Sequence, residues 1–185
     1  MACNLTTKRQ AGAVCGSTQA GLDELKHWLI DRSKITFGGF TAGTRVFTTM
    51  TIAAGGAALL PWNFDKRGFD FTDEMAVDEN TGAITHSPTI HGRMIGLDGA
   101  NAADVEELKN TNLVSIFMTK AGKFIVAGYK SGLTLTTNTT GATSEALGET
   151  VTIGSKDEPE KHYEFLMTDQ ATTLAALIAA ETPTV

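Results

Sequence analysis

The stretch that decides the fold runs from residue 113 to residue 137. It reads LVSIFMT (113–119), KAGK (120–123), FIVAGY (124–129), KSG (130–132) and LTLTT (133–137). Three runs rich in β-branched and aromatic residues are separated by turns that contain Gly and Lys, which predicts an antiparallel meander. The first two runs are almost continuously apolar, so we expect both of their faces to be covered. In the last run Leu alternates with Thr, which predicts one apolar and one solvent-facing side.

The composition fits one folded domain with extended arms. The chain has 185 residues, of which 42% are hydrophobic and 19% charged, and these values argue against wholesale disorder. The formal net charge of -6 excludes a generic basic nucleic-acid binder, because such a protein needs cations to neutralise phosphates. No run of eighteen apolar residues occurs, so we expect no membrane partner.

Other parts of the chain also have strand character. Strands are predicted at residues 35–40, 44–52, 59–64, 68–77, 83–95, 149–153 and 161–167. Residues 21–30 fit a helical face and a strand equally well. Pro61 limits its segment to a sheet edge or a strand end. Across a short acidic turn, residues 68–77 and 83–95 form a long hairpin.

Two segments have helical features. Residues 102–109 carry early acidic residues and follow Asn101, which can cap a helix. Residues 169–180 resemble a short capped helix with Leu174, Leu177 and Ile178 on one face.

The remaining segments have no periodic pattern. Residues 1–20 are interpreted as an extended arm, and residues 137–145, which are rich in Thr, Asn and Gly, as a loop. The chain is therefore divided into residues 1–20 (arm), 21–168 (β domain) and 169–185 (C-terminal segment). The predicted fold is mainly β, an antiparallel β-sandwich or barrel with one short flanking helix.

The sequence holds little reactive chemistry. His86 and His91 are five residues apart in one predicted strand, so they point to opposite faces and cannot readily share a metal. Cys3 and Cys15 lack the further partners that a zinc site needs. No set of acid, base and nucleophile is apparent. We therefore expect no enzyme activity, no cofactor and no metal.

The segment from the predicted helix to residue 154 resembles the major tail tube proteins of tailed bacteriophages. The resemblance rests on a short helix before a strand, a Gly-Lys-aromatic turn at residues 122–124, a Gly-x-x-x-Gly-Leu step at residues 128–133, and a Thr/Gly loop before a closing strand. The opening MACNLT, with the later Cys15, is similar to a recurrent start in predicted virion proteins of these phages.

The resemblance implies a structural protein of the phage tail, assembled in the host cytoplasm. Six subunits would form a ring, inner sheets would join edge to edge into a large barrel, and rings would stack into the tube that ejected DNA passes through. Partners would be other copies of the chain, with sheath, terminator or baseplate proteins. Candidate residues for the lumen or inner sheet are Asp70, Asp73, Glu74, Thr85 and Thr89, and candidates for contacts between subunits are Cys3, Leu5, Phe117, Phe124 and Tyr129.

Two alternatives stay open at this stage. One is another phage virion protein, such as a capsid decoration or tail terminator protein. The other is a non-catalytic ligand-binding β module, which needs an exposed aromatic platform that the dispersed Trp and Tyr residues support weakly.

Overall fold

The computed structural model describes residues 22–40, 43–54, 58–62, 69–95, 105–106, 108–109, 111–142, 147–155 and 158–182. Across these residues the chain is mainly β, as predicted. The strands are β1 (Leu22–Asp31), β2 (Ile35–Gly38), β3 (Val46–Phe47), β4 (Thr49–Ile52), β5 (Leu60–Pro61), β6 (Asp70–Val77), β7 (Ile84–Ile95), β8 (Leu113–Thr119), β9 (Phe124–Ala127), β10 (Thr134–Ala142), β11 (Leu147–Gly154) and β12 (Tyr163–Phe165). Two helical elements accompany them, the 3-10 turn η2 (Arg32–Lys34) and the helix α2 (Gln170–Ala179).

A six-stranded sheet forms the body of the molecule. Its order is β3-β12-β9-β8-β1-β5, which places β8 and β9 in the interior. The first five residues of β8 are all buried, as the continuous apolar pattern predicted. Pro61 lies on the edge strand β5, also as predicted. The pairing of β12 with β3 is parallel, which the antiparallel prediction did not include.

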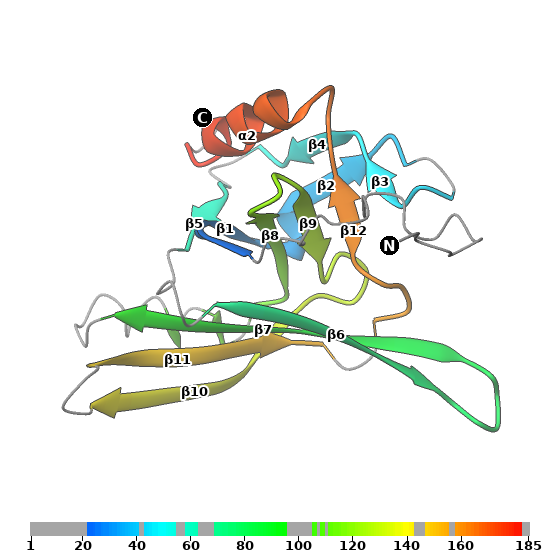
Figure 1. Cartoon of the computed structure of the whole chain (residues 1–185), viewed down its shortest axis with the longest axis vertical. Coiled ribbons are helices and arrows are strands. Elements are labelled where there is room, and N and C mark those ends of the chain that lie inside the picture. Colours follow the sequence, from blue (N-terminus) through cyan, green and yellow to red (C-terminus); the bar gives the residue numbers. More distant parts are fainter. Residues whose placement is uncertain are drawn as a thin grey trace, which may run out of the picture.

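A four-stranded antiparallel sheet lies beneath that body (Figure 1). Its order is β10-β11-β7-β6. The predicted long hairpin is confirmed, since β6 and β7 pair from Asp70 with His91 to Val77 with Ile84. The hairpin extends beyond the rest of the molecule at one end (Figure 1). A two-stranded sheet, β2 with β4, completes the described strands.

The predicted meander is wrong at its third strand. β8 and β9 pair as expected, but β10 pairs with β11 in the other sheet. Leu133, which precedes β10, forms an isolated bridge with Leu113 at the start of β8. The chain leaves the first sheet at Gly128 and Gly132, both at positive φ, where the amide of Gly132 bonds the carbonyl of Gly128. Residues with side chains rarely adopt that backbone, so the two glycines permit the change of sheet.

Two further predictions need correction. Residues 137–145 were expected to be a loop, but β10 continues to Ala142 and pairs with β11 throughout. The strand predicted at residues 44–52 is interrupted at Thr48, and its halves, β3 and β4, belong to different sheets. Residues 21–30 fitted both a helix and a strand; from Leu22 onward they belong to β1, and Gly21 lies outside the described residues.

The helix predicted at residues 169–180 is confirmed as α2. Asp169 caps it, since its carboxylate accepts a hydrogen bond from the amide of Thr172. Leu177 is fully buried and Leu174 partly, whereas Ile178 is 51% exposed and does not share the buried face. Around the other predicted helix, Val105, Glu106 and Leu108 are helical, and Asn101 lies outside the described residues.

Two hydrophobic clusters lie on opposite sides of the six-stranded sheet. The first joins this sheet to the two-stranded sheet and α2 through residues such as Trp28, Phe37, Phe47, Ile116, Phe165 and Leu177. The second joins it to the four-stranded sheet through residues such as Leu29, Phe117, Ile90, Val151 and Ile153. The C-terminal helix therefore packs on the same core as the strands. The four-stranded sheet covers the second cluster with one face and leaves its other face outward.

Candidate functional site

The outward face of the four-stranded sheet is mainly composed of hydroxyl side chains. Strand residues alternate between faces, and Ile90, Val151 and Ile153 define the inward set. Following the pairing registers, the outward set with hydroxyl groups is Thr72, Thr85, Ser87, Thr89, Thr137, Thr139, Thr150 and Thr152. The same face carries the charged side chains of Asp70, Glu74 and Arg93, with His91 bonded to Thr152 at 3.0 Å.

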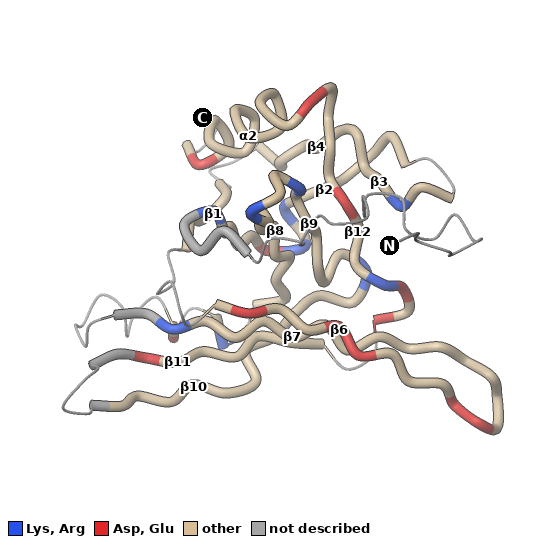
Figure 2. The backbone as a smooth tube through the Cα atoms, in the orientation of Figure 1, with Lys and Arg blue, Asp and Glu red and all other residues tan. Residues whose placement is uncertain are grey.

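Both edge strands of this sheet are long and have no partner among the described residues. β10 has nine residues and β6 has eight. Proteins usually protect such edges with charged side chains, Pro or bulges, because unpaired backbone groups attract another strand. β10 contains neither a charged residue nor Pro and has one register shift near its start, and Figure 2 shows it without charged positions. β10 is therefore a weakly protected edge.

The projecting hairpin exposes apolar side chains on its inward face. Met75 is 63%, Val77 53% and Ile84 52% exposed, and Val77 pairs directly with Ile84. This is the same face that carries Phe71 and Ile90 into the core, continued past the end of the body. Exposed apolar groups on a continuous core face indicate a surface that a partner can cover.

A well-ordered acidic turn closes the hairpin. The carboxylate of Asp78 accepts hydrogen bonds from the amides of Asn80 and Thr81, at 2.8 Å and 3.0 Å. These bonds, led by that from Thr81, lower the pKa of Asp78. Gly82 has a φ of 69°, a conformation that favours Gly.

A buried carboxylate ties the base of the hairpin to the body. Asp73 lies on the inward face of β6, with its side chain only 5% exposed. Its oxygens lie 3.3 Å from Nδ1 of His86 and 2.9 Å from Nδ1 of His162. Burial lowers the pKa of His162, and its bond to Asp73 opposes that shift. Because His162 leads directly into β12, this cluster links the two large sheets.

A second buried carboxylate lies close to the cluster of Asp73, His86 and His162. Glu158 is 2% exposed, and its two oxygens accept hydrogen bonds from the amides of Lys130 and Ser131, each at 2.8 Å. Its own backbone pairs with His86 of β7. It thus fixes the 128–132 turn against the hairpin. No local signal in the sequence marks Glu158 as buried.

The structure separates the residues that the sequence assigned to an inner sheet. The outward face carries Asp70, Glu74, Thr85 and Thr89. Asp73 lies on the opposite face, in contact with His86 and His162. The sequence reasoning missed the hydroxyl residues of β10 and β11. The alternation of Thr at residues 137, 139, 150 and 152 was the available signal.

The residues assigned to subunit contacts have different outcomes. Phe117 and Phe124 are each 1% exposed within one chain, so a second subunit cannot reach them. Tyr129 is partly buried against Phe37 and Phe47. Cys3 and Leu5 lie outside the described residues.

The histidines are engaged in structural contacts. His27 is fully buried with Nε2 2.7 Å from Oγ of Ser115, and burial lowers its pKa to about 3. Within the described ranges no group of His, Cys, Asp and Glu side chains could hold a metal ion. The same ranges contain no helix long and apolar enough to cross a membrane.

Comparison with protein-family models, curated proteins and solved structures finds no match to this chain. The resemblance to tail tube proteins therefore stays a prediction.

Proposed function

We propose that this protein is a structural subunit that assembles into stacked rings and forms a tube of the phage tail-tube type. The two packed sheets would be its sandwich, and the four-stranded sheet its contribution to the tube wall. The observation that carries the proposal is that this sheet combines a covered face, a polar outward face and two long edges that lack partners among the described residues.

The number of strands favours closure into a ring. Neighbouring strands in β10-β11-β7-β6 are all antiparallel, so the two edge strands run in opposite directions. When a second copy is rotated about an axis roughly parallel to the strands, its β6 runs antiparallel to β10 of the first. The antiparallel hydrogen-bond ladder then continues from one subunit to the next. Closure of the ring leaves no strand edge exposed.

The chemistry of the outward face suits a channel for DNA. Hydroxyl groups remain hydrated and carry no charge, while Asp70 and Glu74 repel phosphate groups. Among the described residues of the four strands, Arg93 is the one Lys or Arg side chain on this face. A surface that holds DNA would need many such cations. We therefore assign Asp70, Glu74, Thr85 and Thr89 to the lumen and leave Asp73 out.

The projecting hairpin supports assembly independently. A monomer in water gains nothing from exposing Met75, Val77 and Ile84 together, whereas contact with another subunit buries them. Burial of apolar surface contributes roughly 25 cal/mol for each Å². Burial of these side chains by a neighbouring subunit would explain why the hairpin extends beyond the body of the molecule.

The role of β10 as the edge between subunits can be tested by placing charged side chains on it. Thr137→Glu with Thr139→Glu places two carboxylates on β10, facing the side of the sheet where a neighbour's β6 would bring Asp70 and Glu74. Like charges on neighbouring strands are destabilising. We expect this variant to remain folded and to lose rings and tubes in electron micrographs and light scattering.

Two controls make the result specific. Thr49→Glu with Thr51→Glu makes the same change, at the same spacing, on the exposed side of β4 and should leave assembly intact. Thr137→Lys with Thr139→Lys should weaken assembly less than the Glu pair. If the Glu pair on β10 assembles as well as the unchanged protein, β10 is not the subunit edge.

A further inference from the structure

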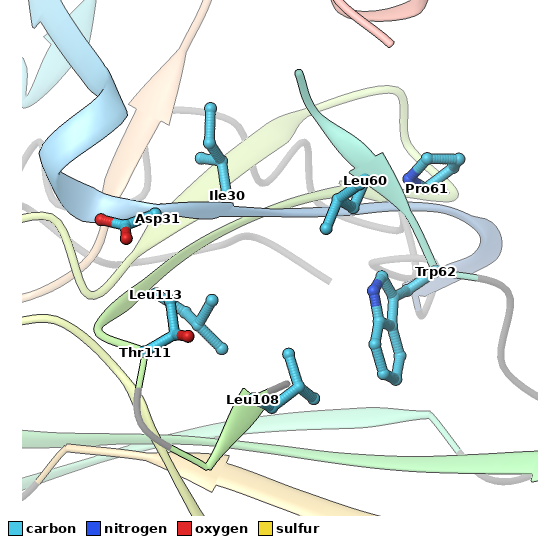
Figure 3. A pocket seen from close by; sticks show the side chains of 8 residues that line it. All are labelled: Ile30, Asp31, Leu60, Pro61, Trp62, Leu108, Thr111 and Leu113. Carbon is cyan, nitrogen blue, oxygen red and sulfur yellow. The ribbon is translucent and has the colours of Figure 1, made fainter. Parts of the chain in front are cut away.

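A pocket lies on the side of the molecule where β1 ends, between the edge strand β5 and the start of β8 (Figure 3). Its volume is about 320 Å³. It is lined by Ile30, Asp31, Leu60, Pro61, Trp62, Leu108, Thr111 and Leu113. Such a volume is at the lower end of the range for small-molecule sites.

Most of the pocket wall is apolar and fixed. Trp62 is 8%, Leu108 4% and Leu113 3% exposed, and all three belong to the core cluster between the two large sheets. The amide of Trp62 bonds the carbonyl of His27 at 2.7 Å, which fixes the backbone that carries the indole. Leu60 is 50% exposed, so the pocket is open to solvent on this side.

Asp31 gives this apolar pocket one negative charge. One carboxylate oxygen accepts a hydrogen bond from the amide of Ser33 at 2.7 Å. None of the ion pairs among the described residues involves Asp31. Arg32, its neighbour in sequence, instead donates from Nε to the carbonyl of Tyr129. The carboxylate therefore remains available to an incoming cation.

We propose that this pocket binds an organic ammonium ion with an apolar or aromatic body. The body would displace water from Trp62, Leu108 and Leu113. The ammonium would meet the carboxylate of Asp31, at the end of the pocket where Thr111 also lies (Figure 3). This site lies away from the outward face of the four-stranded sheet, so it stands or falls separately from the proposed assembly.

Two sources could supply this chemistry. One is a free amine, and the other is a basic side chain of the same polypeptide. Residues 1–20 contain two basic side chains, Lys8 and Arg9, which are adjacent. The ligand chemistry is the same in both cases, and a competition experiment separates them.

The test is calorimetric titration of the full chain with 2-phenylethylammonium chloride. We expect saturable binding with a dissociation constant of about 1 mM or tighter, as ligands of this size reach in apolar sites. The neutral isostere 2-phenylethanol should bind about tenfold more weakly, because it lacks the charge that Asp31 recognises.

Variants assign the effect to the pocket. Asp31→Asn keeps a side-chain oxygen to cap η2 but removes the charge, and it should weaken binding of the ammonium about tenfold. Asp169→Asn makes the same change at the exposed cap of α2 and should leave binding unchanged. Saturation of the unchanged protein with no preference for the ammonium over the alcohol overturns the proposal. So does the absence of binding, or an unaltered affinity in Asp31→Asn.

Lys8→Ala with Arg9→Ala identifies the source. Tighter binding of 2-phenylethylammonium in this variant supports a pocket that the chain's own basic residues occupy. Unchanged binding supports a pocket for a free amine.

Discussion

The two large sheets differ in what their faces touch. In the six-stranded sheet, β8 is buried on both faces, with Val114 and Ile116 in one core cluster and Leu113 and Phe117 in the other. In the four-stranded sheet, one face packs on the core and the other presents hydroxyl groups to solvent. The first sheet therefore specifies the fold, and the second can be altered on its outward face with little effect on folding.

The largest expected contrast comes from truncating one side chain in each sheet. Phe117→Ala removes a fully buried ring between the sheets and should reduce the free energy of unfolding by about 3 to 5 kcal/mol. Thr139→Ala, on the outward face of β10, should change it by less than about 0.5 kcal/mol. Urea denaturation followed by circular dichroism measures both. Equal losses would mean that the two sheets share one structural role.

Acid should act on the six-stranded sheet through His27. Burial lowers its pKa from 6.5 to about 3, so the fold holds the neutral imidazole. Its contribution to stability is complete above pH 6.5 and is lost as the pH falls from 6.5 towards 3, by up to about 1.4 kcal/mol for each pH unit.

A substitution at His27 tests this prediction. We expect His27→Gln to flatten the dependence of the unfolding free energy on pH between 6.5 and 4, because it removes the buried imidazole. If this variant keeps the slope of the unchanged protein, another group controls the acid response.

A smaller contrast lies within one strand. Asp73→Asn removes the charge that faces His86 and His162 and should cost about 1 to 3 kcal/mol, because the hydrogen bonds between the charged carboxylate and the amide and Nδ1 of His162 are lost at a buried site. Glu74→Gln, its exposed neighbour on the opposite face, should cost less than about 0.5 kcal/mol. Thermal unfolding of both variants at pH 7 tests this. Equal effects would contradict the role of Asp73 as the link between the sheets.

Local patterns predicted strands better than they predicted which strands pair. The continuous apolar run of β8 identified a central strand, because burial on both faces leaves no polar position. β10 was cut short because Asn138 and Gly141 are typical of loops, yet the ladder to β11 holds them extended. Its sheet was misjudged because the turn from Gly128 to Gly132 directs the chain away from β9.

The alternation of strand residues made the faces of the candidate site predictable, but not the contacts between distant segments. Successive residues of a strand point to opposite faces, so Asp73 and Glu74 lie on different faces of β6. Asp73 shares its face with Phe71, which packs against the core. A cluster of acids in sequence therefore did not imply a cluster in space. The partners of Asp73 could not be predicted, because His162 lies directly before β12 of the other sheet, 89 residues away in sequence. Glu158 is buried for the same kind of reason, since it meets a distant turn.

In the proposed assembly the four-stranded sheet closes into a ring through its β10 and β6 edges. Electron microscopy of the purified full chain over a range of concentrations tests this closure. We expect rings and then stacked tubes, with a continuous barrel on the inside whose lumen is lined by Thr85 and Thr89. Particles that remain monomeric at every concentration, or an assembly in which those threonines face outward, would contradict it.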